Sequence, residues 1–268
     1  MTRQDIFTTC RSGVAQVVLE SGREQLTAGT SFLVRGGLVT NSHVIRDVEF
    51  DVAVIRFEDM DRAAGIRLSR EACEAAVAYE SPRAENDVVL LQLEEPEFAG
   101  RHVFAFGDSG DLRVGDEVDF MGFPFRLPQL TCHVGYVSSL HRDGGVDVIQ
   151  VDGSVNGGNS GGPLIELSGD KVVGIISRAE VGFLADQFDE LIRTLTRNIE
   201  QLERSTGARV VLAGVDPVQG LRASQAALRE IAVSVRRSAN VGIGYAFSSN
   251  HIRDRIAELQ QGQAKRAG

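Results

Sequence analysis

Short apolar runs separated by glycine and polar residues make up the first part of the chain. They are rich in valine, isoleucine, leucine and phenylalanine, and they occupy residues 13–21, 29–34, 37–41 and 52–57. Runs of this length and composition are typical of β-strands and are too short for helices. The alanine-containing stretch 62–79 leaves two interpretations open, a helix or a loop followed by a strand.

A second series of strand-like runs follows further along the chain. A buried strand is predicted at 87–93 and is closed by Glu94, Glu95 and Pro96. Further strands are predicted at 117–123, 131–140, 146–152 and, after the glycine-rich stretch 157–162, at 171–177. Many short strands joined by glycine and proline turns indicate a mostly β protein, built as a barrel or a sandwich.

The hydrophobic pattern changes to a helical one after residue 177. Steps of three and four residues place one apolar stripe on a long helix, formed by Leu184, Phe188, Leu191, Ile192, Leu195, Ile199 and Leu202. A strand-like stretch at 208–214 precedes a second helix that begins near Pro217. A strand at 242–247 and a helix at 251–261, capped by Ser249 or Asn250, complete the pattern. The two long helices therefore form an insert, whose stripes either pack within the protein or bind a partner.

Composition and charge narrow the range of functions. The chain has 28 lysine and arginine residues against 37 aspartate and glutamate residues, a formal net charge of −9. An acidic balance argues against binding to nucleic acid or to an anionic membrane surface. No apolar stretch is long enough to span a membrane. The three cysteines, Cys10, Cys73 and Cys132, form no closely spaced pair, and the amino terminus has no signal-peptide pattern. These features predict a cytoplasmic protein.

Three residues with side chains suited to catalysis lie in a predicted tight turn or at the ends of predicted strands. Glycines flank Ser160 in the sequence Gly157–Pro163, which favours a tight turn that presents the hydroxyl and directs backbone amides to one point. His43 directly follows a predicted strand, and Asp87 stands at the start of another. The spacings are 44 residues from His43 to Asp87 and 73 residues from Asp87 to Ser160. Histidine, aspartate and serine in this order are typical of the trypsin-type double barrel rather than of subtilisins or α/β-hydrolases.

The sequence resembles the trypsin-fold serine proteases, specifically the HtrA/Deg branch. The matching segments are 38–45, 106–116, 121–125, 158–163 and 244–250, and the resemblance covers 13–178 and 241–259. It implies two six-stranded β-barrels, with a helical insert before the last strand and a C-terminal helix. The first barrel would comprise 1–98 and carry His43 and Asp87. The second would comprise 99–178 with 241–268 and carry Ser160, and the insert would be 179–240.

The resemblance also implies a serine endopeptidase mechanism without metal or cofactor. Ser160 would attack the peptide carbonyl, His43 would act as base and then as acid, and Asp87 would orient the histidine. Glu85 is a rival for that last role. Backbone amides of Gly158, Asn159 and Ser160 would form the oxyanion hole. The histidines expected to be structural are His102, His133, His141 and His251.

The substrate pocket is expected to select a small or medium aliphatic side chain. By family analogy, it is formed by Ser154, Val155, Ile176 and Ser177. Arg178 lies close enough to favour an acidic residue instead. A polypeptide is the expected substrate.

Two departures from the family pattern affect regulation. Asn159 stands where zymogen-type relatives have an aspartate that binds a freed amino terminus, so activation by amino-terminal cleavage is not expected. A carboxy-terminal PDZ domain, usual in this branch, is not expected after the last predicted strand, and the resemblance implies that the insert 179–240 interrupts a loop beside the substrate pocket. We therefore expect a regulatory or docking role for the insert, with a protein partner, although a buttress role stays open. The alternative functions are a catalytically latent module that binds peptides or partner proteins, and a general esterase.

Overall fold

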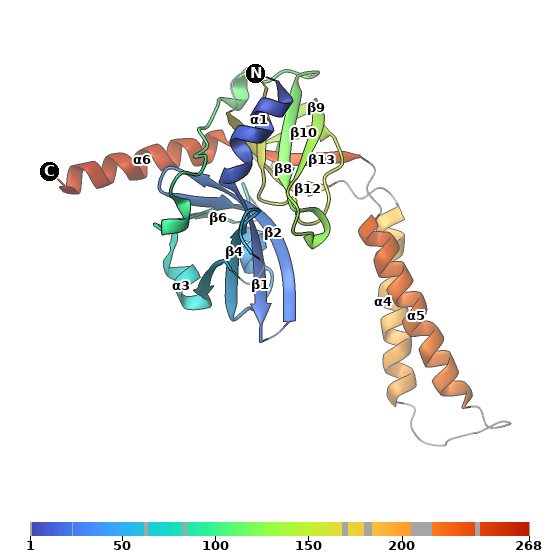
Figure 1. Ribbon diagram of the computed structural model, residues 1–268. Coiled ribbons are helices and arrows are strands. Elements are labelled where there is room, and N and C mark those ends of the chain that lie inside the picture. The colour runs from blue at the N-terminus through green and yellow to red at the C-terminus, as the bar shows by residue number, and fades with distance from the viewer. Residues whose placement is uncertain are drawn as a thin grey trace. The chain divides into compact units, whose positions relative to one another are not determined.

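The structure is a computed structural model that describes residues 2–22, 24–61, 64–82, 85–167, 171–179, 184–204, 216–238 and 242–267. By their contacts the residues group into two units, one of residues 1–179 and 242–268 and the other of residues 180–241. The larger unit contains both β-sheets and the smaller one contains the insert (Figure 1). The domain boundary at residue 98 stays a prediction, because the contacts place both sheets in one unit.

The first sheet carries His43 and Asp87 beside its strands. Its seven antiparallel strands are ordered β5-β4-β1-β2-β3-β7-β6, with bounds β1 Val14–Ser21, β2 Glu24–Val34, β3 Gly37–Thr40, β4 Val52–Phe57, β5 Ile66–Ser69, β6 Val77–Ser81 and β7 Val88–Leu91. A closed six-stranded barrel was expected here, whereas the structure has a seven-stranded sheet whose edge strands β5 and β6 do not pair. The helix α3, Arg70–Ala75, stands between the edge strands β5 and β6, and its buried Cys73 packs into the core that both edges share. This order also resolves the ambiguous stretch 62–79 into strand, helix and strand.

The second sheet closes into the expected six-stranded barrel. Its strand order is β10-β13-β12-β11-β8-β9, with bounds β8 Glu117–Gly122, β9 Thr131–Asp143, β10 Val146–Asp152, β11 Pro163–Glu166, β12 Val172–Ala179 and β13 Ile243–Ser248. Alternate residues of these strands fill the interior, including Val118, Phe120, Ile149, Leu164 and Val173. The mostly β fold with helices before and after the last strand is confirmed.

A helix that the sequence pattern did not reveal lies near the junction of the two sheets. This helix, α1 (Arg3–Cys10), begins with a capping box in which Thr2 and Asp5 exchange hydrogen bonds. Its buried residues Ile6 and Cys10 join a core cluster that contains Phe32 from β2 and Met121 from β8. The helix thus buries its apolar side against both sheets (Figure 1). The other helices of this unit are α2, Ser42–Arg46, and α6, Asn250–Ala267.

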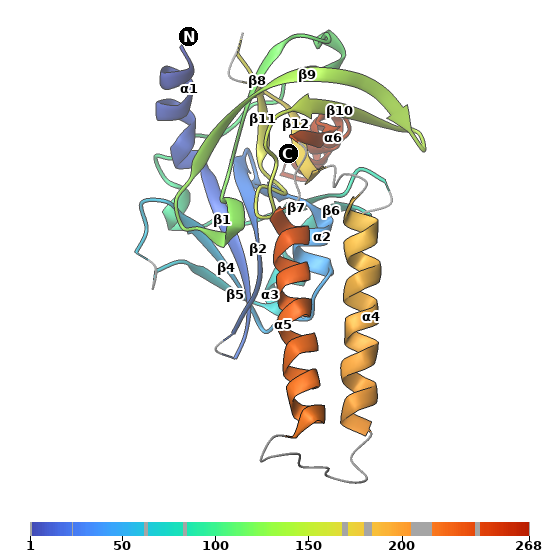
Figure 2. The same ribbon diagram turned by 90° about the vertical axis from the view of Figure 1, so that its right-hand side faces the viewer.

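The insert forms an antiparallel helical hairpin, α4 (Leu184–Arg204) with α5 (Pro217–Ser238). Both helices were predicted from the sequence pattern, but the apolar stripe expected on the inner side of the second helix is exposed. Thr196 accepts a hydrogen bond from Arg229, and Asn198 donates one to Gln225, so the two helices run in opposite directions (Figure 2). Leu195 is buried in this hairpin. The strand predicted at 208–214 lies outside the described residues.

The hairpin is inserted between β12 and β13, two strands that pair with each other in the barrel. Strands β12 and β13 are antiparallel neighbours, and Ala179 at the end of one is paired with Gly244 near the start of the other. The insert therefore occupies the connection between two neighbouring barrel strands.

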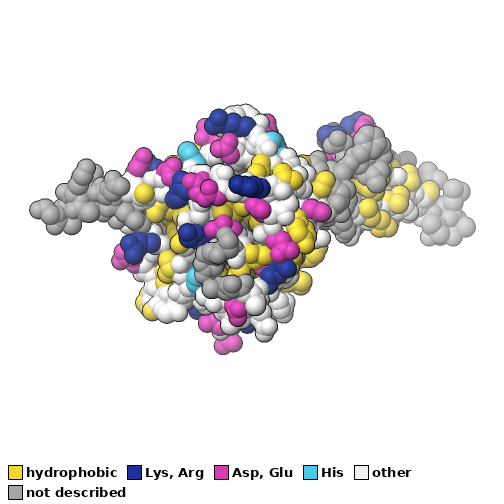
Figure 3. Space-filling model, turned by 90° about the horizontal axis from the view of Figure 1, so that it is seen from above, with side chains coloured by type: hydrophobic (Ala, Val, Ile, Leu, Met, Phe, Trp, Pro, Cys, Tyr) yellow, Lys and Arg dark blue, Asp and Glu magenta, His cyan; other side chains and the backbone are white. Residues whose placement is uncertain are grey.

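Among the described helices, none combines the length and apolar character that crossing a membrane requires. Figure 3 shows acidic and basic side chains intermixed on the visible face of the larger unit.

The position of Ile6 gives a test of how far α1 contributes to the fold. The change Ile6→Ala removes a fully buried side chain from the cluster that both sheets share. We expect the free energy of unfolding to fall by about 2–5 kcal/mol in urea titrations. The matched control is Thr9→Ala on the exposed side of the same helix, expected to stay within about 0.5 kcal/mol. Equal stabilities for the two variants would show that α1 does not anchor the sheets.

Candidate active site

His43 is carried by the short helix α2, immediately after strand β3. Asn41 stands at the N-cap of this helix, and its Nδ2 donates a hydrogen bond of 2.7 Å to the backbone oxygen of Asp87. The backbone N–H of Ser42 donates to the same oxygen at 3.3 Å. The start of α2 is therefore fixed directly to the loop that carries Asp87.

Asp87 is buried, and its carboxylate lies against His43. It accepts hydrogen bonds from the His43 Nδ1 at 2.7 Å and from the His43 backbone N–H at 3.0 Å. A third hydrogen bond of 2.8 Å comes from the Ser177 hydroxyl, and this contact is buried. Asp87 adopts a left-handed backbone conformation with φ of 47°, a region that aspartate tolerates better than most residues. The rival Glu85 instead accepts a hydrogen bond from Ser81, so Asp87 is the carboxylate that reaches His43.

Ser160 lies in the glycine turn as the sequence predicted. Gly158 and Gly161 have φ angles of 103° and 87°, and a Cβ at Gly161 would lie 2.1 Å from the Thr30 oxygen. Only glycine fits there without displacing β2. The Ser160 hydroxyl donates to the backbone oxygen of Ser177 at 2.8 Å, and no hydrogen bond joins it to His43 among the described contacts. The structure thus pairs His43 with Asp87 and leaves Ser160 on a different acceptor.

The turn around Ser160 offers two backbone donors. Within the described residues, the amides of Gly158 and Ser160 donate to no group of the chain. The Asn159 amide was expected among the oxyanion donors, but it donates to the Asn156 oxygen at 3.0 Å. It is therefore occupied by the turn itself, and the Gly158 and Ser160 amides are the candidates that stay available.

Thr30 of strand β2 joins the two halves of the site. Its backbone N–H donates to the Ser160 oxygen at 2.8 Å, and its hydroxyl donates to the Gly158 oxygen at 2.6 Å. The same hydroxyl accepts from the Phe123 amide at 3.1 Å, while the Thr30 oxygen accepts from the Thr40 hydroxyl. A residue of the first sheet thereby fixes the serine turn of the second. Sequence reasoning missed it, although a polar pair inside the apolar run 29–34 was a signal.

The predicted pocket residues lie in three different environments. Ser154 is exposed, whereas Val155 and Ile176 are fully buried in the core of the second barrel. A side chain enclosed in this core does not contact a ligand unless the segment moves, so the pocket assignment stays a prediction. Ser177 has a role that the sequence did not reveal, since its hydroxyl holds Asp87 and its carbonyl holds Ser160.

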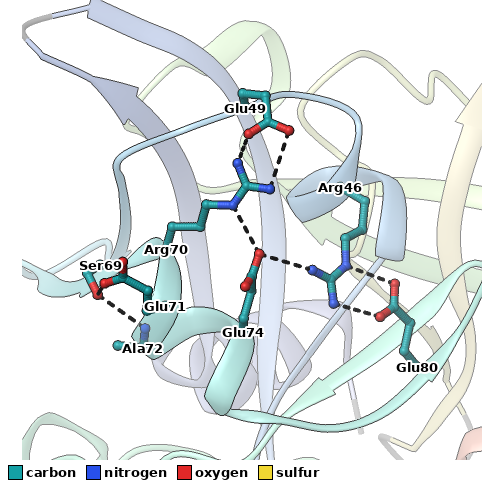
Figure 4. A network of polar contacts seen from close by, with 8 residues as sticks. All are labelled: Arg46, Glu49, Ser69, Arg70, Glu71, Ala72, Glu74 and Glu80. Atoms are coloured by element: carbon teal, nitrogen blue, oxygen red, sulfur yellow. Dashed lines mark hydrogen bonds and ion pairs between the residues drawn. The ribbon is translucent and has the colours of Figure 1, made fainter.

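An ion-pair network fixes the helix α2 from the outside (Figure 4). Glu80 accepts a hydrogen bond of 2.6 Å from the Ser42 hydroxyl and two from the Arg46 guanidinium. Arg46 also lies near Glu74, which pairs with Arg70, and Arg70 pairs with Glu49. The hydrogen bonds from Arg46 lower the pKa of Glu80, so this carboxylate stays charged well into the acid range. The network links α2 to β6 and α3.

The other histidines stand apart from His43. His102 contacts Cys10 and Phe104, His141 packs on Tyr245, and His251 contacts Tyr79. His133 stacks on Phe120 and contacts Asn159. In the ranges that the structure describes, no group of three or more histidine, cysteine or acidic side chains is arranged to hold a metal ion.

Thr30 provides a test of the link between the sheets. The change Thr30→Val keeps the side-chain volume but leaves the Gly158 oxygen and the Phe123 amide without this partner. We expect the free energy of unfolding to fall by about 1–3 kcal/mol, measured by chemical denaturation. The control Thr27→Val, on the same strand and partly exposed, is expected to change it by less than about 0.5 kcal/mol. A Thr30 variant as stable as this control would contradict the assignment.

The sequence matches a protein family and is similar to several known proteins. Residues 29–175, more than half of the chain, match the family described as trypsin-like peptidase domain. A probable periplasmic serine endoprotease DegP-like of Brucella suis is 35% identical over 179 residues, which cover 65% of this chain and 32% of the relative. Human serine protease HTRA4 is 33% identical over 164 residues, 56% of this chain and 30% of the relative. The chain therefore spans about a third of the length of these relatives.

The fold is also similar to a solved HtrA-type structure. The HtrA-type protease AlgW with decapeptide aligns with a TM-score of 0.59 and 17% identity, covering 96% of this chain and 68% of that chain. At this identity the likeness shows the fold alone. The resemblance to the HtrA/Deg branch is confirmed as a similarity in sequence and in architecture. With its family match across both sheets, the chain belongs to the trypsin-like peptidase domain family.

Proposed function

We propose that the chain is a serine endopeptidase that acts through Ser160, His43 and Asp87. The observation that carries the proposal is the contact of 2.7 Å between the His43 Nδ1 and the buried Asp87 carboxylate, in a protein of the trypsin-like peptidase family. The names of its relatives, serine endoprotease and serine protease, support the same reaction class.

The proposed mechanism assigns one step to each group. His43 accepts the Ser160 proton as the hydroxyl attacks the peptide carbonyl, and the Asp87 carboxylate stabilises the resulting imidazolium. The amides of Gly158 and Ser160 donate to the oxygen that becomes negative in the tetrahedral intermediate. His43 then protonates the leaving amine, and the acyl group on Ser160 is released by water.

A rotation of the Ser160 side chain precedes the first step. The hydroxyl must leave the Ser177 oxygen, to which it donates at 2.8 Å, and turn toward His43. One neutral hydrogen bond contributes only about 1 kcal/mol net, and side chains change rotamer within nanoseconds. The rotation is therefore no obstacle to catalysis, and it releases a carbonyl that a peptide N–H can use.

A second candidate function is a catalytically latent module that binds peptides or partner proteins. The observation that favours it is the same Ser160–Ser177 hydrogen bond, because in this state His43 does not contact the nucleophile. The polypeptide as substrate or ligand is common to both candidates. A cytoplasmic location also stays a prediction. This prediction is supported by the three cysteines, none of which forms a disulfide. The name of the Brucella relative, which is periplasmic, points the other way.

We further propose that the hairpin α4–α5 orders the substrate pocket when a protein partner binds. Strand β12, after which the hairpin follows, ends at Ala179, two residues after Ser177, the residue that contacts both Asp87 and Ser160. Four side chains of α5 are 42–60% exposed and share one side of the helix, namely Leu221, Leu228, Ile231 and Val235. An apolar stripe that α4 leaves uncovered is typical of a helix that binds another protein.

Reactivity of Ser160 tests the first proposal directly. A fluorophosphonate probe is expected to label the purified protein and to leave Ser160→Ala unlabelled. The labelling rate of Asp87→Asn is expected to fall by about 10⁴-fold, the loss that the same change causes in trypsin. Ser138→Ala on the exposed side of β9 serves as the control and should label normally. A wild-type protein that resists the probe and cleaves no peptide would favour the latent module.

Removal of the hairpin tests the regulatory proposal. Because Ala179 and Gly244 are paired neighbours, a short glycine-serine turn can replace residues 180–241 without opening the barrel. We expect the shortened variant to lose any increase in peptide cleavage that a partner causes in the full chain, while probe labelling of Ser160 stays within about 3-fold. A folded variant that cleaves peptides at the wild-type rate and still responds to the same partners would refute a regulatory insert.

A further inference from the structure

Asn159 connects the serine turn to a histidine outside the proposed catalytic set. It stands between Gly158 and Ser160, and its backbone is fixed by bonds from its amide to the Asn156 oxygen and from the Gly162 amide to its own oxygen. Its side chain is fully buried, and its Nδ2 lies 3.3 Å from the His133 Nε2. No other hydrogen bond reaches this side-chain amide among the described residues, and its Oδ1 is buried without a partner.

The ring of His133 is held in a fixed plane. His133 on β9 stands opposite Phe120 on β8, and the two rings stack with centroids 4.7 Å apart and an angle of 11° between the planes. This stacking aims the Nε2 atom toward the serine turn. Gly122 on β8 provides the space for the approach, because a Cβ there would lie 2.8 Å from the Asn159 Oδ1. Phe120 and Gly122 therefore both support the contact between His133 and Asn159.

The contact depends on the protonation state of the ring. A ring nitrogen accepts a hydrogen bond from the Asn159 amide only when it carries no proton. Burial lowers the pKa of His133, which keeps the ring neutral at neutral pH. The nearby ionisable groups Asp119, Cys132 and Arg3 are associated with the other face of strands β8 and β9, since Asp119 is paired with Val134 and Cys132 with Met121. The serine turn itself contributes only the neutral Asn159, and among the described residues no carboxylate pairs with His133.

We propose that His133 is a positioning residue that holds the Gly158–Ser160 turn through Asn159, and that protonation of its ring releases this turn. The proposal rests on the proposed function, since the turn supplies both the nucleophile and the oxyanion donors. A neutral asparagine–histidine pair thus supports the turn, and it responds to acid.

Kinetics of Ser160 labelling separate this role from a merely structural one. His133→Phe retains the aromatic stack but offers no acceptor, and we expect its labelling rate at pH 8 to fall by about 10- to 100-fold. His133→Gln supplies an amide oxygen and should recover the rate to within about 3-fold. With a peptide substrate, kcat should fall in the Phe variant while KM stays unchanged. His141→Gln, a histidine remote from the turn, is the control.

The acid limb of the pH profile gives the second readout. The wild-type rate should fall as His133 is protonated, and this step should be absent from the profile of the His133→Gln variant. A Phe variant that labels as fast as wild type at pH 8, or a Gln variant with an unchanged acid limb, overturns the proposal. The control variant should retain the wild-type profile.

Nuclear magnetic resonance distinguishes failure of this proposal from failure of the proposed function. In ¹⁵N-labelled protein, including the Ser160→Ala variant, the Asn159 side-chain amide signal should shift with the titration of His133. This measurement needs no catalysis, so it decides the proposal even if wild type is not labelled by the probe. A titration of His133 that leaves the Asn159 amide signal unmoved contradicts it.

Protonation of His133 also predicts how the free energy of unfolding changes with pH. Because burial lowers the folded-state pKa of His133, the unfolded chain binds more protons just below pH 6.5. The contribution of His133 to stability is therefore complete above the unfolded-state pKa and is lost as the pH falls through the folded-state value. His133→Gln should flatten this part of the pH dependence of unfolding, and an unchanged slope would argue against a buried neutral ring.

Discussion

The hydrogen bonds of Thr30 are the constraint on which the site depends. His43 and Asp87 adjoin strands of the first sheet and Ser160 adjoins a strand of the second, so no single sheet can set the distances among them. Thr30 contacts Ser160, Gly158 and Phe123 from strand β2, and it does so with backbone and hydroxyl groups that are fully buried. Buried polar groups require partners, and here the Ser160, Gly158 and Phe123 partners all lie across the boundary between the sheets. The cost of leaving them unsatisfied keeps the two halves in register.

The sequence was sufficient for features that local pattern and order determine. Short β-branched runs predicted most strands, and the apolar stripe from Leu184 to Leu202 predicted α4. The order of His43, Asp87 and Ser160 indicated the double-sheet arrangement, and the structure brings His43 and Asp87 into contact. These inferences needed only periodicity, turn residues and spacing, because such signals are encoded within a few residues of each position.

Features that arise from tertiary packing were missed. Helix α1 has a weak apolar pattern, and only its capping box at Thr2 and Asp5 was a sequence signal. The assignment of Val155, Ile176 and Ser177 to a pocket stays a prediction. The sequence did not reveal that the barrel core encloses Val155 and Ile176. It also did not reveal that the hydroxyl and carbonyl of Ser177 bridge Asp87 and Ser160. No local pattern records which hydroxyl reaches a carboxylate ninety residues away in the chain.

The antiparallel course of the hairpin also bears on how the chain folds. Pairing β12 with β13 requires residues on either side of a long insertion to meet, and closing a flexible loop of that length carries an entropic penalty. The α4–α5 contacts between Thr196 and Arg229 and between Asn198 and Gln225 are local in comparison, and they bring the first turn of α4 near the last turn of α5. Local contacts form early, so a hairpin that collapses first shortens the effective loop that the last two barrel strands must close. The insertion therefore slows closure of the barrel far less than an unstructured segment of equal length.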